Sequence, residues 1–382
     1  MEKIYTAMGL MSGSSLDGVD LSIIESDGHK EFRSILDRYF EYDKELVQKI
    51  LILRGKITDS EKLNKYFSEI KDLERKITLF HAEAIKETLR MSKSSVDLIG
   101  FHGQTIFHDP EKRITKQLGD GKLLSQLTKK IVVYNFRQND LENGGQGAPL
   151  TPIFHNVLAN KLNKKFSLGF PLNFLNIGGI SNFTSTVDWK NLEHKLNGIN
   201  ACDIGPGNCL IDEWIRKNSK KKYDKDGLIA KSGTIDKLVL NQALENFEEN
   251  SNYEKSLDVR DFDIFFAKGL SLENGAATIT NFTATLIANG MRFANEIDRS
   301  SINKWLVCGG GRKNKYLLEN IKNIFKKIII EPIDQYEIDG DFVESQAFGY
   351  LAVRSFLKLP ISFPSTTGCI KPSTGGIVVK NF

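Results

Sequence analysis

The chain has 382 residues, of which 40% are hydrophobic and 26% charged, and its net charge is +4. This length allows two domains with separate cores, in a globular protein without the roughly 18 consecutive apolar residues of a membrane span. The small charge argues against nucleic acid as the main partner. Four cysteines without a C-x-x-C pair, and a start without an apolar secretory core, indicate a cytoplasmic protein rather than a disulfide or zinc framework.

The first motif is Gly9–Asp20, with the sequence GLMSGSSLDGVD, between apolar strand-like runs at Ile4–Met8 and Leu21–Glu25. Its glycines allow a tight turn and let an anion approach bare N–H groups. Its polar side chains are Ser14, Ser15, Asp17 and Asp20. Hydroxyls add donors, and a carboxylate can hold Mg²⁺ through water. We predict a phosphate-binding β-hairpin; an ordinary Gly/Ser turn is the alternative on this stretch alone.

Scaffold elements follow this hairpin. A third strand is expected at Phe32–Phe40 and a helix at Tyr42–Arg54. Apolar residues at spacings of three and four predict one long amphipathic helix from Asp59 to about Met91.

Two strands then deliver polar groups. Val96–Phe101 runs into His102 and Gln104, at the kind of strand end where α/β sheets place ligands. His102 is a base, a phosphate or sugar donor, or a structural histidine. A strand at Ile131–Asn135 leads to a loop with Arg137 and a Gly-Gly-x-Gly run, which suits a polyhydroxylated or carboxylated ligand unless it is a plain connection.

The chain passes to a second domain near a helix predicted at Pro149–Leu162. Beyond it, Phe174–Ile177, a turn at Gly178–Asn182 and Phe183–Val187 form a second hairpin with the layout of the first. We interpret the pair as an internal duplication, with the two hairpins facing one cleft.

The next polar turn follows a strand that ends at Asp203. Residues Asp203–Asn208, DIGPGN, lead into a helix at Asn208–Lys217, and the amides of a helix N-terminus attract an anion. The Asp203 carboxylate can accept a proton from a nucleophile there.

A third glycine turn follows in the last part of the chain. Helices at Ile235–Asn250 and Glu273–Ile297 flank a charged loop, Lys255–Phe262. A strand at Trp305–Cys308 leads into Gly309–Asn314, whose three glycines suit adenine and ribose or, alternatively, a packing-driven turn.

Together these turns exclude some nucleotide folds and favour another. There is no P-loop pattern, and no G-x-G-x-x-G follows a strand with an acidic residue behind it. The layout is that of the actin/hexokinase/Hsp70 class, in which two turns bracket the phosphates and the third holds the nucleoside. The residues assigned to ATP binding are Gly13, Ser14, Ser15, Leu16, Asp17, Gly18, Val19, Asp20, Gly178, Gly205, Gly207, Asn208, Gly309, Gly310, Gly311 and Asn314.

Eight motifs in order resemble those of the anhydro-N-acetylmuramic acid kinase family, over almost the whole chain. They are GLMSGSSLDGVD, GFHGQTIFH, NGGQGAPL, LNIGGISN, DIGPGN, YDKDG, LVCGGGRKN and ESQAFGYLA. The chain has Ser14 where the family usually has threonine, and Lys255–Val259 where many members have Lys-Ser-Thr-Gly-Arg.

The resemblance implies an α/β fold of two actin-like (ribonuclease H-like) domains, with mixed sheets flanked by helices and an interdomain cleft. We expect the N-terminal lobe at 1–140 plus about 350–382, and the C-terminal lobe at 141–349. A homodimer is compatible with this interpretation, although the sequence does not fix the oligomeric state.

The implied reaction opens 1,6-anhydro-N-acetylmuramic acid with water and phosphorylates O6 with ATP and Mg²⁺. Asp203 would be the base for the water, as in the base half of an inverting glycosidase, and Asp17 the Mg²⁺-side carboxylate, acting through water. The implied sugar contacts are His102, Gln104, Arg137 and Glu344. Two alternatives are a kinase of an ordinary N-acetylhexosamine hydroxyl and a non-catalytic actin-like nucleotide sensor.

Overall fold

The computed structural model describes residues 3–13, 15–92, 95–189, 198–248, 253, 255–298 and 304–382. Two compact units divide the chain. The first holds residues up to Lys161 and from Phe342 onward, and the second holds most of those between Leu162 and Asp341. None of the helices in the described ranges is long and apolar enough to span a membrane.

The first unit is built on one mixed sheet with the strand order β12-β6-β4-β1-β2-β3, with β5 beside β4. Its strands are β1 (Tyr5–Ser12), β2 (Gly18–Ser26), β3 (Phe32–Glu41), β4 (Leu98–Asp109), β5 (Ile114–Leu118), β6 (Ile131–Tyr134) and β12 (Ile377–Val379). Its helices are α1 (Lys44–Lys56), α2 (Glu61–Lys65), α3 (Phe67–Ser92), α4 (Gly121–Thr128), α5 (Gln138–Glu142), α13 (Val343–Phe356) and α14 (Pro364–Thr367). Helix α6 (Pro152–Phe166) carries the chain into the second unit.

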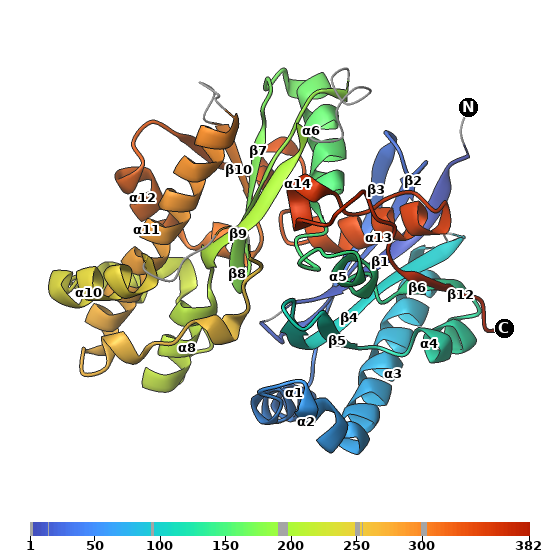
Figure 1. Cartoon of the computed structure of the whole chain (residues 1–382), viewed down its shortest axis with the longest axis horizontal. Coiled ribbons are helices and arrows are strands. Elements are labelled where there is room, and N and C mark those ends of the chain that lie inside the picture. Colours follow the sequence, from blue (N-terminus) through green and yellow to red (C-terminus); the bar gives the residue numbers. More distant parts are fainter. Residues whose placement is uncertain are drawn as a thin grey trace. The chain divides into compact units, whose positions relative to one another are not determined.

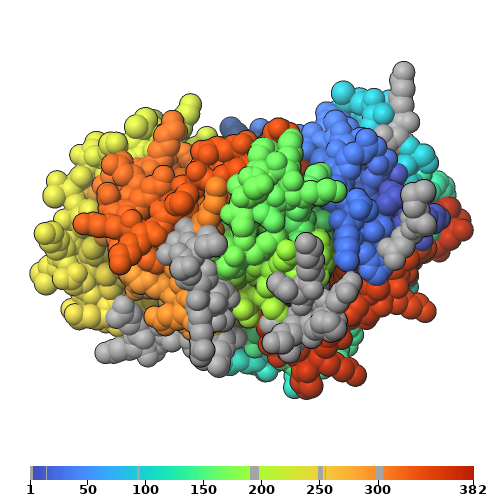
Figure 2. Space-filling view, turned by 90° about the horizontal axis from the view of Figure 1, so that it is seen from above, coloured from blue at the N-terminus to red at the C-terminus, as the bar shows by residue number. Residues whose placement is uncertain are grey.

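The second unit repeats the central part of this sheet in the order β11-β10-β7-β8-β9. Its strands are β7 (Asn173–Ile177), β8 (Ile180–Ser185), β9 (Asn200–Pro206), β10 (Lys304–Cys308) and β11 (Ile329–Pro332). Its helices are α8 (Cys209–Asn218), α9 (Leu228–Ser232), α10 (Lys237–Glu248), α11 (Leu272–Asp298) and α12 (Lys315–Ile324). Helices α10, α11 and α12 are part of the yellow-to-orange surface at the left of Figure 2.

Both sheets have the same pairing. Three strands run antiparallel in a meander, β1-β2-β3 or β7-β8-β9, and two further strands join the first of them in parallel, β4-β6 or β10-β11. This is the ribonuclease H-like arrangement, present twice. The predicted fold class and the duplicated hairpins are therefore confirmed.

Helices cover the two faces of the first sheet in different ways. Side chains of α1 and α3 such as Ile50 and Ile77 share a core with Met8 and Leu10 of β1. Because successive side chains of a strand point to opposite faces, Gly9 lies on the other face, under α13. Figure 1 shows α3 and α13 on opposite sides of β1 and β4.

Glycines bring α13 unusually close to the sheet. A Cβ on Gly9 would lie 1.9 Å from the Ser345 carbonyl oxygen, and one on Gly100 would lie 2.2 Å from that of Phe348. All of α13 thus belongs to the first unit, which resumes at Phe342, whereas we expected the lobe to resume at about 350. At the other boundary the first unit extends to Lys161, whereas we expected it to end at 140.

Two sequence-based element predictions need correction. The long helix predicted from Asp59 to about Met91 is interrupted at Tyr66, which leaves the helical conformation with φ −102°. The strand predicted to end at Asp203 continues as β9 to Pro206, so Asp203 lies inside a strand and not at its end.

Candidate active site

The phosphate hairpin predicted in the first unit is shorter than the motif suggested. Gly9 and Gly18 lie in β1 and β2, so residues 13–17 alone make the turn, and Ser14 lies outside the described residues. Gly9 is required for the approach of α13, and a Cβ on Gly18 would lie 2.2 Å from the Phe40 carbonyl oxygen. Two of the three motif glycines therefore serve packing.

The turn itself has features that an ordinary surface loop lacks. Leu16 has a φ of 60° although it is a bulky residue buried in the core, and such backbone conformations are uncommon and concentrate at functional sites. The Ser15 hydroxyl donates to Asp17 Oδ1 at 2.6 Å, and the Tyr39 hydroxyl donates to the Asp17 carbonyl oxygen at 2.8 Å. The turn thus presents an exposed, oriented carboxylate at Asp17. Val19 and Asp20 follow it on β2.

Gln104 is tied to this turn. It is fully buried on β4, and its Nε2 donates to the Gly13 carbonyl oxygen at 3.0 Å. Its Oε1 is also buried, with no hydrogen-bond partner among the residues that the structure describes. A residue predicted to contact the sugar therefore holds the phosphate turn through one end of its amide.

A buried polar group under the hairpin was missed by the sequence analysis. The Ser12 hydroxyl lies 2.9 Å from the Tyr42 hydroxyl and 3.2 Å from His81 Nε2. Burial lowers the pKa of His81 to about 4, so the ring is neutral. These side chains come from β1, α3 and the segment before α1, and no sequence pattern in scaffold helices marks such a contact.

His102 and Arg137 form a pair in the first unit. Arg137 Nε donates to His102 Nε2 at 3.0 Å, and His102 Nδ1 lies 2.7 Å from the Gly103 carbonyl oxygen. Since arginine cannot accept a hydrogen bond, His102 is the neutral tautomer with its proton on Nδ1. Burial, and next the charge of Arg137, hold the pKa of His102 well below 6.5. In this arrangement the basic nitrogen of His102 is engaged in orienting Arg137.

The loop after Arg137 is organised by Asp140, which the sequence analysis did not single out. Arg137 Nη1 donates to the Gly147 carbonyl oxygen at 2.8 Å, and the Gly147 amide donates to Asp140 Oδ2 at 2.7 Å. Asp140 Oδ1 accepts from the Thr367 hydroxyl, also at 2.7 Å. A Cβ on Gly145 would lie 2.2 Å from Asp140 Oδ2, which explains one glycine of the Gly-Gly-x-Gly run.

Glu344 lies half-buried in the first turn of α13. Four residues further on, Phe348 packs against the His102 ring, with 4.6 Å between ring centroids. Residues four apart share one face of a helix. Glu344 is therefore on the α13 face that contacts His102, and the structure brings three of the predicted sugar residues, His102, Arg137 and Glu344, to one region of the first unit.

In the second unit, the predicted nucleotide turns meet at the end of β7. The amides of Gly207 and Asn208 donate to the carbonyl oxygens of Gly179 and Gly178 at 2.8 and 2.7 Å. A Cβ on Gly207 would lie 2.2 Å from the Gly178 oxygen, so this contact requires glycine. Helix α8 begins directly after Asn208 and presents its N-terminus here.

The Gly309–Gly311 turn also lies at the end of β7, and its three glycines have different roles. A Cβ on Gly309 would lie 2.5 Å from Asn176 Oδ1, and one on Gly311 would lie 2.2 Å from a side-chain carbon of Ile177. These two serve packing. A Cβ on Gly310 would meet, among the described residues other than its chain neighbours, only Asn208 Nδ2 within 4 Å, at 3.9 Å, so the face of Gly310 is open. Asn314 caps α12, accepting from the Leu317 amide at 3.0 Å.

Asp203 lies on β9, the edge strand of the second sheet, and is 5% exposed. Its Oδ2 accepts from the Leu257 amide at 2.9 Å. The loop Lys255–Phe262, for which the motifs predicted no role, thus orients the candidate base. Gly205, two residues on, has a φ of 151°, and its missing side chain leaves room for Leu286.

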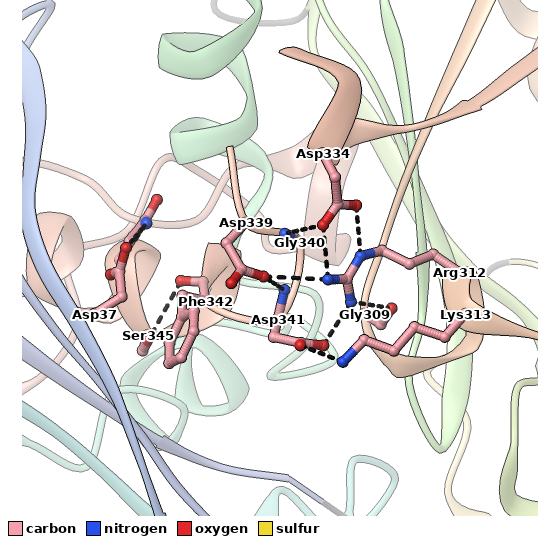
Figure 3. A network of polar contacts seen from close by, with 11 residues as sticks. Asp37, Gly309, Arg312, Lys313, Asp334, Asp339, Gly340, Asp341, Phe342 and Ser345 are labelled. Carbon is pink, nitrogen blue, oxygen red and sulfur yellow. Dashed lines mark hydrogen bonds and ion pairs between the residues drawn. The ribbon is translucent and has the colours of Figure 1, made fainter. Parts of the chain in front are cut away.

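Arg312 was not predicted as a site residue, although it follows the triple glycine directly. Its guanidinium contacts the carboxylates of Asp334, Asp339 and Asp341, as Figure 3 shows. These ion pairs raise the pKa of Arg312 against the opposing effect of its burial. The three aspartates lie in a loop more than twenty residues away, so no local pattern reveals the contact.

Within the described part of the chain, no three His, Cys, Asp or Glu side chains are grouped so that they could hold a metal ion. The residues do fit the mode predicted for Mg²⁺, in which one exposed carboxylate, Asp17, acts through water.

Comparison with known proteins agrees with the motifs. A family model described as anhydro-N-acetylmuramic acid kinase matches residues 5–381. The anhydro-N-acetylmuramic acid kinase of Pelagibacter ubique (strain HTCC1062) is 50% identical over 384 residues, covering 100% of both chains. That of Agrobacterium fabrum is 37% identical over 388 residues, covering 100% of both, and that of Zymomonas mobilis is 38% identical over 380 residues, covering 97% of this chain and 98% of the relative. The chain belongs to the anhydro-N-acetylmuramic acid kinase family.

Proposed function

We propose that this kinase opens 1,6-anhydro-N-acetylmuramic acid with water and transfers the γ-phosphoryl group of ATP to O6. The water oxygen bonds to C1, and its proton passes to Asp203. The C1–O6 bond breaks, and its electron pair stays on O6, which bonds to the γ-phosphorus as the bond to ADP breaks. The products are N-acetylmuramic acid 6-phosphate and ADP. No acid is needed for the leaving oxygen, because O6 takes up a phosphoryl group instead of a proton.

One observation carries the assignment of Asp203. The carboxylate and the Gly207–Asn208 start of α8 belong to one stretch, four residues apart, and the Leu257 amide orients the carboxylate. A proton acceptor is thereby fixed relative to a helix N-terminus, which attracts phosphate oxygens. Both a base and an anion site are needed when water attack is coupled to phosphoryl transfer.

ATP would be divided between two sets of glycine turns. The Gly13–Gly18 amides and an Mg²⁺ ion bound through water to Asp17 would stabilise the charge of the transferring phosphoryl group. The open face of Gly310, beside Asn208, suits the flat base and ribose.

The sugar would be bound by the first unit. Arg137 is oriented by His102 Nε2 and the Gly147 carbonyl oxygen, and it suits the lactyl carboxylate as a charge-assisted partner. Glu344 and the free end of the Gln104 amide would contact the sugar hydroxyls or the acetamido group. Closure of the cleft between the lobes on both substrates, a cytoplasmic location and a homodimer are further parts of the proposal.

The test is mass analysis of the product formed from ATP and the anhydro-sugar in ¹⁸O-water. We expect label at C1 and none in the phosphate. Unlabelled product incubated for the same time in ¹⁸O-water corrects for exchange at the anomeric carbon. Label in phosphate, or none at C1 above this control, would contradict the hydrolytic step.

The alternatives give other results. A kinase of an ordinary hydroxyl would phosphorylate free N-acetylhexosamines as fast as the anhydro-sugar. A nucleotide sensor would release ADP on binding the sugar and form no sugar phosphate.

A further inference from the structure

Arg312 has every hydrogen-bond donor engaged within the protein. Its Nε and Nη2 form a two-pronged contact with Asp334 at 2.7 and 2.9 Å, and Nη2 also donates to Asp339 at 3.1 Å. Its Nη1 donates to Asp341 and to the Gly309 carbonyl oxygen, the latter at 3.1 Å. A guanidinium has five N–H donors, and all five are used. The side chain is 4% exposed, so Arg312 faces inward and does not offer its charge to a ligand.

Arg312 and the loop that it binds hold the first glycine of the nucleotide turn at its carbonyl and amide ends. The Gly309 amide donates to the Gly340 carbonyl oxygen at 3.0 Å, while its own carbonyl oxygen accepts from Arg312. A Cβ on Gly340 would lie 2.4 Å from Arg312 Nε, so a side chain at this position would displace the guanidinium. Figure 3 shows the loop that carries Asp334, Asp339 and Gly340 facing Arg312 and Gly309.

The charge of this group argues against a second anion site. Three carboxylates face two cations, Arg312 and Lys313, which leaves one net negative charge. Such a group repels phosphate. What it supplies is rigidity, since a planar guanidinium with bidentate carboxylate partners holds one geometry.

We propose that Arg312 is a positioning residue for the nucleotide. It holds the Gly309–Gly311 turn in the shape that accepts the nucleoside, without touching the nucleotide itself. This inference rests on the proposed assignment of that turn to ATP.

The test compares Arg312→Lys and Asp334→Asn with the control Lys313→Ala. Arg312→Lys keeps the positive charge but cannot form the bidentate contact with Asp334. Asp334→Asn weakens the same bidentate contact by removing the carboxylate charge. Lys313 also pairs with Asp341, but its side chain is 62% exposed and Gly309 is held by Arg312, so the loss of Lys313 should leave the turn intact. Three quantities are measured: hydrogen exchange of the Gly309–Asn314 amides, ADP affinity by calorimetry, and the KM values for ATP and sugar separately.

For both test variants we expect faster exchange in the turn, ADP affinity lower by about tenfold, which is about 1.4 kcal/mol, and a matching rise in KM for ATP. KM for the sugar should stay within about twofold, and Lys313→Ala should resemble the wild type. A general loss of stability would raise exchange throughout the second unit, which separates it from the proposed effect.

Three results would overturn the inference, each at a different step. Unchanged exchange in the turn would show that Arg312 does not shape it. Faster exchange with unchanged ADP affinity would show that the turn is shaped by Arg312 but does not bind the nucleotide, and then the proposed ATP site fails with it. An equal rise in both KM values would also contradict a role confined to the nucleotide.

Discussion

Replacing Asp203 by asparagine tests the base assignment most directly. The side chain is 5% exposed, and its Oδ2 accepts from the Leu257 amide at 2.9 Å. Asparagine has the same shape, and its oxygen can keep this hydrogen bond, but it cannot take a proton from water. Removing a general base typically costs about 10²- to 10⁴-fold in rate. This corresponds to a barrier higher by about 3 to 5 kcal/mol.

The assay is ADP formation at saturating ATP and anhydro-sugar, with ADP affinity measured by calorimetry. We expect kcat to fall by at least about 10²-fold, with ADP affinity unchanged. A matched control is Asp263→Asn in the same unit. Asp263 is exposed, and its Oδ1 accepts from the Phe265 amide at 2.8 Å. The control therefore makes the same chemical change and retains the same kind of bond, and its kcat should equal that of the wild type.

Two outcomes would refute this reasoning. If Asp203→Asn keeps kcat within a factor of about three, no proton passes to this carboxylate in a slow step. If kcat and ADP affinity fall together, with a lower melting temperature, Asp203 supports the fold of β9 and its role is structural.

Other substitutions and conditions test the glycine contacts and the buried histidine. Gly310→Ala should weaken ADP binding in calorimetry but change the free energy of unfolding by no more than about 0.5 kcal/mol. Gly207→Ala should weaken ADP binding and also destabilise the second unit by about 1–3 kcal/mol in urea unfolding. Equal stability losses in the two variants would contradict the open face of Gly310. Gly9→Ala should destabilise the first unit by a similar amount or more, since its Cβ would lie 1.9 Å from the Ser345 oxygen; unchanged urea unfolding would argue against the close approach of α13. Burial lowers the pKa of His81 from 6.5 to about 4 in the folded chain. The free energy of unfolding therefore contains the full contribution of neutral His81 above pH 6.5. As the pH falls towards 4, this contribution is lost, which lowers the free energy of unfolding by roughly 3 kcal/mol. His81→Gln should flatten this loss in unfolding measured from pH 7 to 4.5, and an unchanged slope would exclude His81 as its source.

Local patterns in the sequence predicted the architecture well. Apolar runs and the glycine turns between them located both hairpins, the spacing of apolar residues located the main helices, and the family resemblance implied the α/β class. Motif order identified the family, which the comparisons confirm. Glycine runs marked the turns at Gly178, Gly207 and Gly309, and the structure brings these together at the end of β7. Such features are predictable because they depend on the backbone preferences of neighbouring residues.

The sequence by itself thus determined the two-fold α/β plan, the family and the chain positions of the turns. Only the tertiary structure decided which hydrogen bonds hold the turns and loops in place: Gln104 with Gly13, Asp140 with Thr367, and Arg312 with Asp334. It also showed that Gly9 and Gly18 serve strand and helix packing. These pairs join residues 22 to 227 positions apart. Sheet order and helix packing bring such residues together, and a pattern of near neighbours in the chain carries no record of them.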